Sequence, residues 1–413
     1  MWFLFHRKTM YCLLFFHCLI FFYGKVAMSA DWSFTPDIDT IEEYNDNVLF
    51  YFNKVVIKDF ITRVNSTTNI LRKTENTQLN VDSIIIGEKY SKHTDLDTIN
   101  TDNKISFNQQ WNPKLYTTLS GMFRKDEILE TELQRAGLVG VRDTRYRYGF
   151  ALSGTYTLTS LFSLSVSGGE TFTRYPDGPY PDMDLWQINT DLVRVINPRD
   201  SIGLFINYYD ADYKDISNIK TLNSNIYWRR NLSNTTYFVF GAGYRFTWTK
   251  YIVQYLEYFI DPKTGIFIIQ PVKKGETNEN KGFIVNFELN QDWTDRFSMV
   301  INSGREQYNT IDARSIERNY IRTTLSYRLS EKVSSNIQFG YDKTEEEGLR
   351  GEKASYFRVS PFLTWRYTKN LSFRFGTSYE YRDTEADFFS YSKDRFKCWI
   401  GISYSHPRLL ANY

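Results

Sequence analysis

The stretch FRVSPFLTWRYTKNLSFRFGTSYEYR, residues 357–382, alternates apolar and polar side chains along two segments joined by a short polar turn. One side of these segments carries Phe357, Val359, Pro361, Leu363, Trp365 and Tyr367, then Leu371, Phe373, Phe375, Thr377, Tyr379 and Tyr381. The other side carries Arg358, Ser360, Thr364 and Arg366, then Ser372, Arg374, Gly376, Ser378, Glu380 and Arg382. A period of two places these sets on opposite faces of two β-strands. One apolar face and one charged face indicate strands with lipid on one side and a watery lumen on the other. A soluble β-sandwich also alternates, but its inner face rarely stays charged over such a length.

The composition supports a transmembrane β-barrel. The 413 residues are 17% aromatic, with 31 Tyr and 32 Phe, yet the mean hydropathy is −0.46. Beyond the N-terminus the sequence has no apolar run of about eighteen residues, as a membrane-spanning helix requires. A composition that is rich in aromatic residues but polar on average is typical of a barrel whose strands face lipid and water alternately. The formal net charge of +2 gives no reason to expect a nucleic-acid partner.

The N-terminus resembles a secretory signal peptide. Basic residues His6 to Lys8 precede an apolar run from Met10 to about Tyr23, and Ser29-Ala30 supplies small residues for cleavage. The alternative is a membrane anchor, for which the run is short. We predict a signal peptide over 1–30, a barrel over 31–405 and a C-terminal tail over 406–413. The mature chain would keep one cysteine, Cys398, and hence no internal disulfide.

The N-terminal part of the barrel alternates less clearly. After a short periplasmic lead from Asp31, we expect the apolar run Val48–Phe52 to form the first strand. Two further strands are expected over Phe60–Leu71 and Leu79–Gly87. Within the latter, Ile84-Ile85-Ile86 is compatible with either orientation.

A short turn motif recurs about every forty residues. It consists of an apolar residue, a few mostly polar residues, and another apolar residue with which a new strand begins. The copies are Trp111–Leu115, Leu158–Phe162, Ile196–Ile202, Trp228–Leu232, Trp293–Phe297, Leu329–Val333 and Tyr367–Leu371. A propeller has a similar repeat, but each of its blades needs four short strands, whereas these intervals hold two long ones. Tight turns flanked by aromatic residues are typical of the periplasmic end of outer-membrane barrels.

Longer polar connections alternate with these turns. They are Lys125–Asp143, Tyr175–Asp184, Asp210–Ile219, Tyr251–Asn280, Tyr308–Ile316, Asp342–Lys353 and Asp383–Asp394. With one more turn near Lys73–Asn76, this arrangement predicts an all-β, up-and-down antiparallel transmembrane barrel of about eighteen strands, sixteen being the alternative. Barrels of this size enclose an aqueous channel.

Two connections have structure of their own. Lys125–Gly137 has early acidic residues, apolar residues at helical spacing and a terminal glycine, which predicts a short helix either inside the lumen or on the outer rim. Tyr258–Ile269 reads as a hairpin around a Pro/Gly turn. It would project above the membrane, fold inward as a partial plug, or add two strands to the wall.

The mature chain offers little for catalysis. Its histidines are His93 and His406, no Cys/His cluster has metal-ligand spacing, and no phosphate loop or nucleophile elbow is present. We therefore expect no enzyme activity, no cofactor and no metal. The alternative is an outer-membrane hydrolase that uses His93, for which a solvated loop histidine is the simpler interpretation.

The inner face predicted by the alternation is rich in cations. The expected lumen-facing cations are Arg124, Arg147, Arg229, Arg322, Arg328, Arg358, Arg366, Arg374, Arg382 and Lys397. The expected lumen-facing acids are fewer, namely Asp191, Glu288 and Glu380. A basic lumen would favour anions or acidic sugars. The alternative is structural pairing of these cations with loop carboxylates such as Glu345–Glu347.

Aromatic residues gather near the strand ends. They are Tyr146, Tyr148, Phe150 and Tyr156, then Tyr237, Phe238, Phe240, Tyr244 and Phe246. The simpler interpretation is an interfacial girdle. The alternative is an aromatic track for sugars on the lumen wall.

The chain also resembles a family. Trp32, Pro36 and Tyr44-Asn45-Asp46-Asn47, together with Tyr156–Thr159 and the run Gly169–Asp184, resemble outer-membrane β-barrel proteins associated with exosortase/PEP-CTERM and exopolysaccharide gene clusters. The resemblance implies a Gram-negative outer membrane and a role in handling exopolysaccharide, and it supplies no catalytic residues. One departure is His406-Pro407-Arg408, which interrupts the aromatic terminus expected of a last strand.

We therefore expect a porin-like conduit associated with exopolysaccharide export or with the passage of anionic solutes. The alternative is a structural barrel of an envelope export complex with a plugged lumen. The expected partners are outer-membrane lipid and lipopolysaccharide, the barrel-assembly machinery, and polysaccharide or envelope export components.

Overall fold

The computed structural model describes most of the chain between residues 30 and 412. The described residues are 30–50, 56–136, 142–176, 178, 180–260, 267–311, 313, 315–346, 352–386 and 389–412. The predicted signal peptide lies outside them, apart from Ala30.

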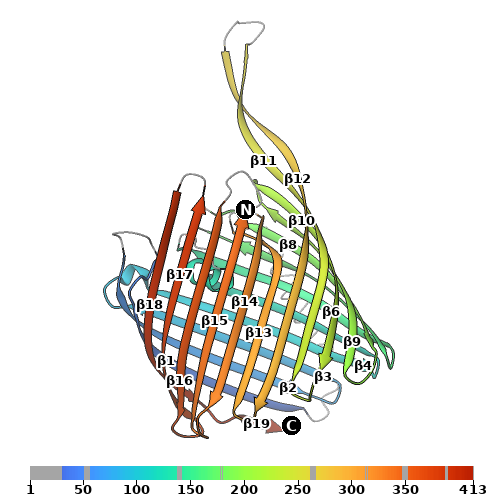
Figure 1. The fold of residues 1–413 in the computed structure, drawn as a ribbon, viewed down its shortest axis with the longest axis vertical. Helices are drawn as coiled ribbons and strands as arrows, with labels where there is room; N and C mark the ends of the chain where they lie inside the picture. Colours follow the sequence, from blue (N-terminus) through green and yellow to red (C-terminus); the bar gives the residue numbers. More distant parts are fainter. Residues whose placement is uncertain are drawn as a thin grey trace.

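The described residues form one large antiparallel sheet (Figure 1). Its strands are β1 (Asp31–Asn45), β2 (Asp59–Lys73), β3 (Thr77–Tyr90), β4 (Thr98–Asn112), β5 (Leu115–Glu127), β6 (Thr144–Thr159), β7 (Phe162–Arg174), β8 (Met183–Val195), β9 (Asp200–Tyr213), β10 (Ser217–Asn231), β11 (Tyr237–Ile260), β12 (Phe267–Thr294), β13 (Phe297–Asn309), β14 (Ser315–Arg328), β15 (Val333–Glu346), β16 (Lys353–Arg366), β17 (Leu371–Ala386), β18 (Phe389–Ser405) and β19 (Leu409–Asn412). Two short helices, η1 (Thr94–Leu96) and α2 (Ile128–Ala136), lie in connections. In this part of the chain, neither helix has the length and apolarity needed to cross a membrane.

The sheet closes on itself. Each strand from β1 to β18 pairs with the next, and β18 pairs with β1 from Asn45 opposite Lys397 to Asp37 opposite Ser405. After residues 406–408, β19 resumes pairing with β1 through Leu409 opposite Phe34. Because β18 and β19 pair with the same strand one above the other, they form one interrupted wall strand. Within the described residues the wall therefore has eighteen strands, which confirms the predicted up-and-down barrel.

The predicted alternation in residues 357–382 is confirmed. Leu363, Trp365 and Phe375 are exposed large apolar residues, whereas Glu380 and Arg382 on the other face are buried. The same alternation runs around the barrel, so that large apolar side chains cover its outer surface. Pairing register places the nine aromatic residues of the two predicted rows on the outer face, except Tyr237, which faces inward beside Glu288. Eight of them therefore lie on the outer surface, as the girdle interpretation requires, and not on the lumen wall.

The first strand differs from the prediction. Asp31–Asn45, expected as a periplasmic lead, is β1, whereas Val48–Phe50 lies in the connection to β2. Tyr51 and Phe52 are outside the described residues. Val48 and Phe50 are apolar because they are buried inside the barrel, and not because they face lipid. The expected strands Phe60–Leu71 and Leu79–Gly87 are confirmed within β2 and β3, and Ile85 faces outward.

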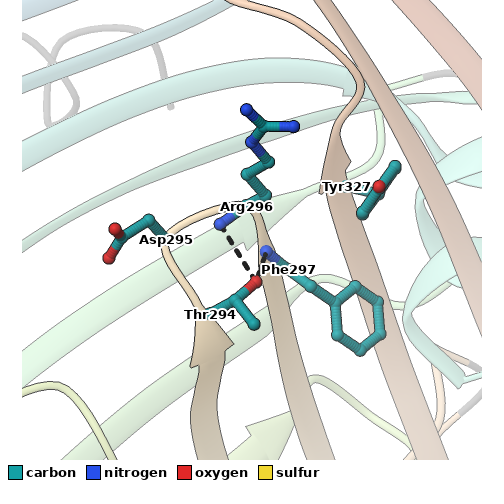
Figure 2. Close-up of a pocket in the computed structure, with 5 residues that line it drawn as sticks. All are labelled: Thr294, Asp295, Arg296, Phe297 and Tyr327. Carbon is teal, nitrogen blue, oxygen red and sulfur yellow. Dashed lines mark hydrogen bonds between the residues drawn. The ribbon is translucent and has the colours of Figure 1, made fainter.

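The tight turns lie at one end of the barrel, here called the turn end, and share one device. In the turn between β12 and β13, Thr294 Oγ1 accepts hydrogen bonds from the backbone N–H groups of Arg296 (3.2 Å) and Phe297 (3.1 Å), as Figure 2 shows. This side chain replaces backbone acceptors that a two-residue reversal cannot supply. The equivalent acceptors in the other turns are Thr74, Asn112, Thr159, Asn197, Ser233, Ser330 and Thr368.

Several connections are shorter or displaced relative to the prediction. The turn expected at Trp228–Leu232 lies at residues 232–236, because β10 continues to Asn231. The connection expected over Asp210–Ile219 is reduced to Lys214–Ile216, and strands extend into those expected over Asp342–Lys353 and Asp383–Asp394. Polar residues at the opposite end of the barrel, here called the loop end, were thus mistaken for loops, since strands there extend into water.

The region Tyr251–Asn280 is not a plug. β11 and β12 pair from Tyr237 opposite Asn290 up to Ile260 opposite Phe267. Figure 1 shows this two-stranded ribbon rising beyond the loop end of the other strands. Of the three possibilities, projection above the wall is the one observed, and residues 261–266 at its turn lie outside the described residues.

The shared turn device predicts a stability effect. Replacing Thr368 with Val removes the acceptor for the N–H groups of Asn370 and Leu371 (3.2 and 2.9 Å). We expect a loss of about 1–2 kcal/mol in unfolding free energy, because each lost hydrogen bond contributes about 1 kcal/mol. The measurement is urea unfolding in detergent micelles. Thr377→Val, on the outer face, is the isosteric control and should leave the midpoint unchanged; an equal loss in both variants would contradict the role of the turn.

Candidate functional site

The lumen contains a helix that crosses it. From α2, Glu130 pairs with Arg395 of β18 (2.5 Å), Glu132 pairs with Arg145 of β6 (2.7 Å), and Leu133 packs with Tyr356 of β16. Around the ring, β6 and β16 are separated by β7 to β15 in one direction and by β17 to β5 in the other. A helix that contacts nearly opposite sides of a closed wall must lie within it, as Figure 1 shows. The predicted helix is therefore confirmed, and its position is the lumen.

The sequence of α2 explains this placement. Ile128, Leu129 and Leu133 are buried, whereas Glu130 and Glu132 meet arginines of the wall. The helix thus buries apolar side chains inside the barrel while its acids neutralise inward-facing cations.

A second segment reinforces the helix. Phe50, between β1 and β2, is fully buried against Leu133 and Tyr356, and the guanidinium of Arg395 lies over its ring at 5.0 Å. Its φ of 50° is a left-handed conformation that a non-glycine residue adopts at a cost, which its buried contacts offset. Another connection also turns inward, since Tyr213 Oη of β9 donates to the carbonyl of Thr310 (3.0 Å).

The contacts of α2 centre on a buried charge network. Arg395 has no exposed surface and bridges Glu130 to Glu380, whose Oε2 lies 2.6 Å from the guanidinium. Lys397 lies 3.3 Å from Glu130 and 3.5 Å from Glu380. Removing one partner of such a network leaves a buried charge uncompensated and costs about 3–5 kcal/mol. The network therefore holds α2 to the β17–β18 wall.

Glu130 stays ionised in this setting. Its position inside the barrel would raise the pKa of the carboxyl, but Arg395 and Lys397 outweigh this effect and hold the pKa well below its ordinary value of 4.5. A lowered pKa means that the stabilising contact is complete above about pH 4.5 and is lost only as the pH falls through the lowered value. The attachment of α2 is thus insensitive to pH in the neutral and mildly acidic range.

The inner wall segregates charge. From β14 to β18 its cations outnumber its acids: register and contacts place Arg318, Arg322, Arg328, Arg358, Arg366, Arg374, Arg382, Lys393, Arg395 and Lys397 there, with Asp342 and Glu380. From β1 to β4 acids prevail: register places Asp31, Asp37, Asp39, Glu43, Asp59, Asp82, Glu88 and Asp102 there, with Arg63, Lys73 and Lys104. The prediction that inward acids are few is therefore wrong, because acidic strands near the N-terminus were not assigned to the inner face.

Register places all ten predicted cations on the inner face, and six of them form ion pairs with carboxylates. The pairs are Arg124–Asp102, Arg147–Asp126 (3.0 Å), Arg322–Asp342 (3.2 Å), Arg374–Asp39, Arg382–Glu352 (3.4 Å) and Lys397–Glu130 (3.3 Å). Most partners lie on neighbouring strands or on α2. The alternative of loop carboxylates is confirmed for one of them, since Glu352 lies in the connection between β15 and β16. Glu345 instead pairs with Lys353 (2.8 Å), and Glu347 is outside the described residues.

The other four cations have no carboxylate of the described residues within salt-bridge distance. Arg358 lies opposite Glu380 in register, and Arg229 lies 4.2 Å from the ring centroid of Tyr237. Arg229, Arg328 and Arg366 are exposed to the lumen near the turn end, here called the basic lower ring. The predicted cations thus divide into six that are paired with carboxylates, Arg358 opposite Glu380, and the three of this ring.

Sequence reasoning missed an uncharged row of side chains on the inner wall. Across β7 to β10 a row of side chains, here called the amide ladder, runs in register through Ser167, Asn189, Asn207 and Asn223. The donor–acceptor distances are 3.1 Å from Asn189 to Ser167, 2.5 Å from Asn207 to Asn189 and 3.0 Å from Asn223 to Asn207. The sequence already shows that these asparagines lie on the inward face of their strands. Only the pairing register shows that they stand next to one another on neighbouring strands.

Of the predicted inward acids, Asp191 and Glu288 lie toward the turn end and Glu380 lies beside α2. Asp191 accepts a hydrogen bond from Tyr227 Oη at 3.0 Å, and Glu288 accepts one from Tyr237 Oη at 2.6 Å. Glu380 belongs to the charge network. All three thus face inward as predicted, each bound to a neighbouring side chain.

His93 has a structural environment. Its Nδ1 lies 2.9 Å from Asp59 Oδ2, and the same carboxylate accepts the backbone N–H groups of Phe60, Lys92 and His93. The imidazole and Asp59 together fasten the connection after β3 to the start of β2. Within the described residues no group of three or more potential metal ligands occurs.

These features define the class of the protein. A closed barrel of eighteen strands with a covering of exposed apolar side chains outside and a charged interior is a transmembrane β-barrel. Such barrels satisfy every backbone group between strands and belong to the outer membrane of Gram-negative bacteria. The chain is an outer-membrane protein.

Comparison with protein-family models and with curated proteins gives no match. Solved structures with a similar fold include Pseudomonas aeruginosa OccK1 (OpdK), with a TM-score of 0.47, 9% identity and coverage of 91% of this chain and 99% of that one. Acinetobacter baumannii OccAB1 has a TM-score of 0.47, 11% identity and coverage of 91% and 96%. P. aeruginosa OccK2 (OpdF) in complex with glucuronate has a TM-score of 0.43, 10% identity and coverage of 91% and 98%. Likeness at this level carries no argument about the solute.

The network predicts how α2 responds to mutation. Glu130→Gln leaves Arg395 and Lys397 without one of their two carboxylates, so we expect α2 to detach more often and the lumen to widen. Planar-bilayer recording should show a larger or noisier open level than in the unaltered protein. Glu331→Gln, in a turn outside the lumen, is the control. Identical traces for both variants would contradict a holding role for Glu130.

The lowered pKa of Glu130 predicts a pH response. Conductance of the unaltered protein should stay constant from pH 8 to pH 5, because the carboxylate remains ionised there. The behaviour of the Glu130→Gln variant should appear in the unaltered protein only well below pH 4.5. A transition near pH 6 would show that another group controls the helix.

Proposed function

We propose that the protein is a non-catalytic, porin-like conduit for anionic solutes. The observation that carries this proposal is the basic lower ring, whose Arg229, Arg328 and Arg366 face the lumen with no carboxylate of the described residues in salt-bridge distance. A fixed positive charge in a water-filled lumen raises the local concentration of anions and lowers that of cations. The six paired cations contribute less, because adjacent carboxylates neutralise them.

The amide ladder supports a narrower solute class. Carboxamides both donate and accept hydrogen bonds, as a hydroxyl-rich solute requires. An anionic solute bearing hydroxyl groups, such as an acidic saccharide, would therefore meet cations on one side of the lumen and amides on another. This class includes the building blocks of acidic exopolysaccharides, which is where the family resemblance points. Deleting the gene and measuring secreted polysaccharide tests that association.

Charge selectivity tests the main proposal. In a planar bilayer under a KCl gradient, the unaltered protein should give a reversal potential of the sign expected for Cl⁻ preference. The triple variant Arg229→Gln, Arg328→Gln, Arg366→Gln should shift that potential toward zero or reverse it. Arg194→Gln is the matched control, since Arg194 lies on the outer face over Phe162. Cation preference in the unaltered protein would overturn the proposal.

The amide ladder is tested with paired solutes. Asn207→Ala interrupts the ladder at its centre, so liposome swelling with glucuronate should slow more than swelling with acetate. Asn302→Ala, on the inner face of β13 outside the ladder, is the control. Equal slowing for both solutes would restrict the ladder to a structural role.

A structural barrel for an envelope export complex is the second candidate. The observation that favours it is α2, which is fixed across the lumen by buried ion pairs. A plugged scaffold would give no conductance in a planar bilayer, whereas a conduit would. Conductance that appears only when Glu130 is replaced would favour the scaffold.

A further inference from the structure

One sector of the outer surface is unlike the rest. On β2 to β4, register places Ser66, Thr68, Ser83, Thr101 and Asn103 on the face that also carries the exposed Val64, Ile85 and Ile99. These five polar residues, here called the polar island, are adjacent: Thr68, Ser83 and Asn103 are aligned in register, and so are Ser66 and Thr101 on either side of Ile85.

The polar island lies within the apolar covering. Along β3 it is bounded by outward-facing Val81 below and Ile85 above, and along β4 by Ile105 below and Ile99 above. On β2, Ile70 and Val64 bound it in the same way. Along these three strands the island is thus bounded by residues suited to lipid, whereas on the β5 side Phe123 adjoins Asn103 and the outward-facing Lys125 adjoins Thr101.

Other sectors show what a lipid-facing surface of this barrel looks like. Along β9 to β12 the outward residues include Leu204, Ile226, Phe240 and Val285, all of them exposed apolar side chains. A row of hydroxyl and carboxamide groups in that environment would be costly, because hydrocarbon offers them no hydrogen-bond partners.

The island is only partly satisfied by itself. Ser83 Oγ donates to Asn103 Oδ1 at 2.6 Å. Within the part of the chain that the structure describes, Asn103 Nδ2 has no hydrogen-bond acceptor, and the buried Thr101 Oγ1 has no partner either. The carboxamide donors are therefore available to a group from outside the chain.

We propose that the polar island is a subunit interface at which a second copy of this chain packs in the membrane. The island's own residues carry no charge that would bind a lipid phosphate, and the one adjoining cation in register, Lys125, lies at its edge opposite Thr101. Asn, Ser and Thr each donate and accept hydrogen bonds, so the same patch on two copies is complementary to itself, as a closed symmetric assembly requires.

The surroundings allow close approach. Small and hydroxyl-bearing residues are the ones that bring membrane segments together and bond across their interface. Gly87, on the outer face of β3 next to the island, has open space where a Cβ would stand, so a neighbouring wall can approach there.

Site-directed crosslinking tests the proposal. In a Cys398→Ser background, which removes the free outer-wall thiol, Ser83→Cys should crosslink two copies when outer-membrane vesicles are treated with a short bis-maleimide. Ile226→Cys, exposed on the outer face of β10, is the matched control and should give a monomer on the denaturing gel. Equal crosslinking at both positions, none at position 83, or an adduct whose mass is not a multiple of this chain would overturn the proposal.

A second measurement is independent of the cysteine variants. The unaltered protein in mild detergent should have a mass that is a multiple of the single chain by light scattering, and Ser83→Leu combined with Asn103→Leu should shift it to one chain. Retained heat-modifiable gel mobility will show that the variant barrel is folded. Should this double variant fail to fold, Ser66→Leu alone serves as the test. A single-chain mass for the unaltered protein would refute the interface.

Discussion

The structure depends on backbone hydrogen bonding that leaves no open edge. Inside a bilayer an unpaired N–H or C=O group has no water to bind, so a sheet must close. Here closure occurs at the seam between β1 and β18, which β19 extends after a three-residue interruption. A side-chain contact also crosses the seam: Arg374 of β17 lies in register with Gly401 of β18 and reaches Asp39 of β1.

Closure brings two kinds of inner wall together. The C-terminal strands supply cations and the N-terminal strands supply acids, and the two groups of strands become neighbours at the seam between β18 and β1. The helix α2, in the connection between β5 and β6, then adds Glu130 to the cations of β18 and Glu132 to Arg145 of β6, so that the loop-end half of the lumen is an ion-pair network. The turn-end half keeps Arg229, Arg328 and Arg366 in reach of water. Within the described part of the chain, the loop-end half of the lumen is thus largely neutralised and the turn-end half keeps unpaired positive charge. This difference arises from the order of the strands and from the insertion of α2.

The outer surface is also constrained by the absence of water in the bilayer. Where the wall contacts lipid it presents large apolar residues, and the polar residues of β2 to β4 stand out against this background. Polar groups within such a surface are tolerated where another protein surface satisfies them. The charged lumen and the polar island therefore concern different activities, solute passage and assembly, and each can fail without the other.

The sequence by itself determined the class, because period-two alternation over residues 357–382 and the recurring turns leave few folds other than an eighteen-strand barrel. It also determined that Arg328 and Arg366 face inward and that a helix follows Lys125. It placed the first strand wrongly, since Val48 and Phe50 are apolar for a reason that lies in the lumen. Only the tertiary structure decided that α2 spans the lumen, that Glu130 meets Arg395 across 265 residues, and that Asn189, Asn207 and Asn223 align. The physical reason is that alternation specifies a face, whereas register and closure specify a neighbour.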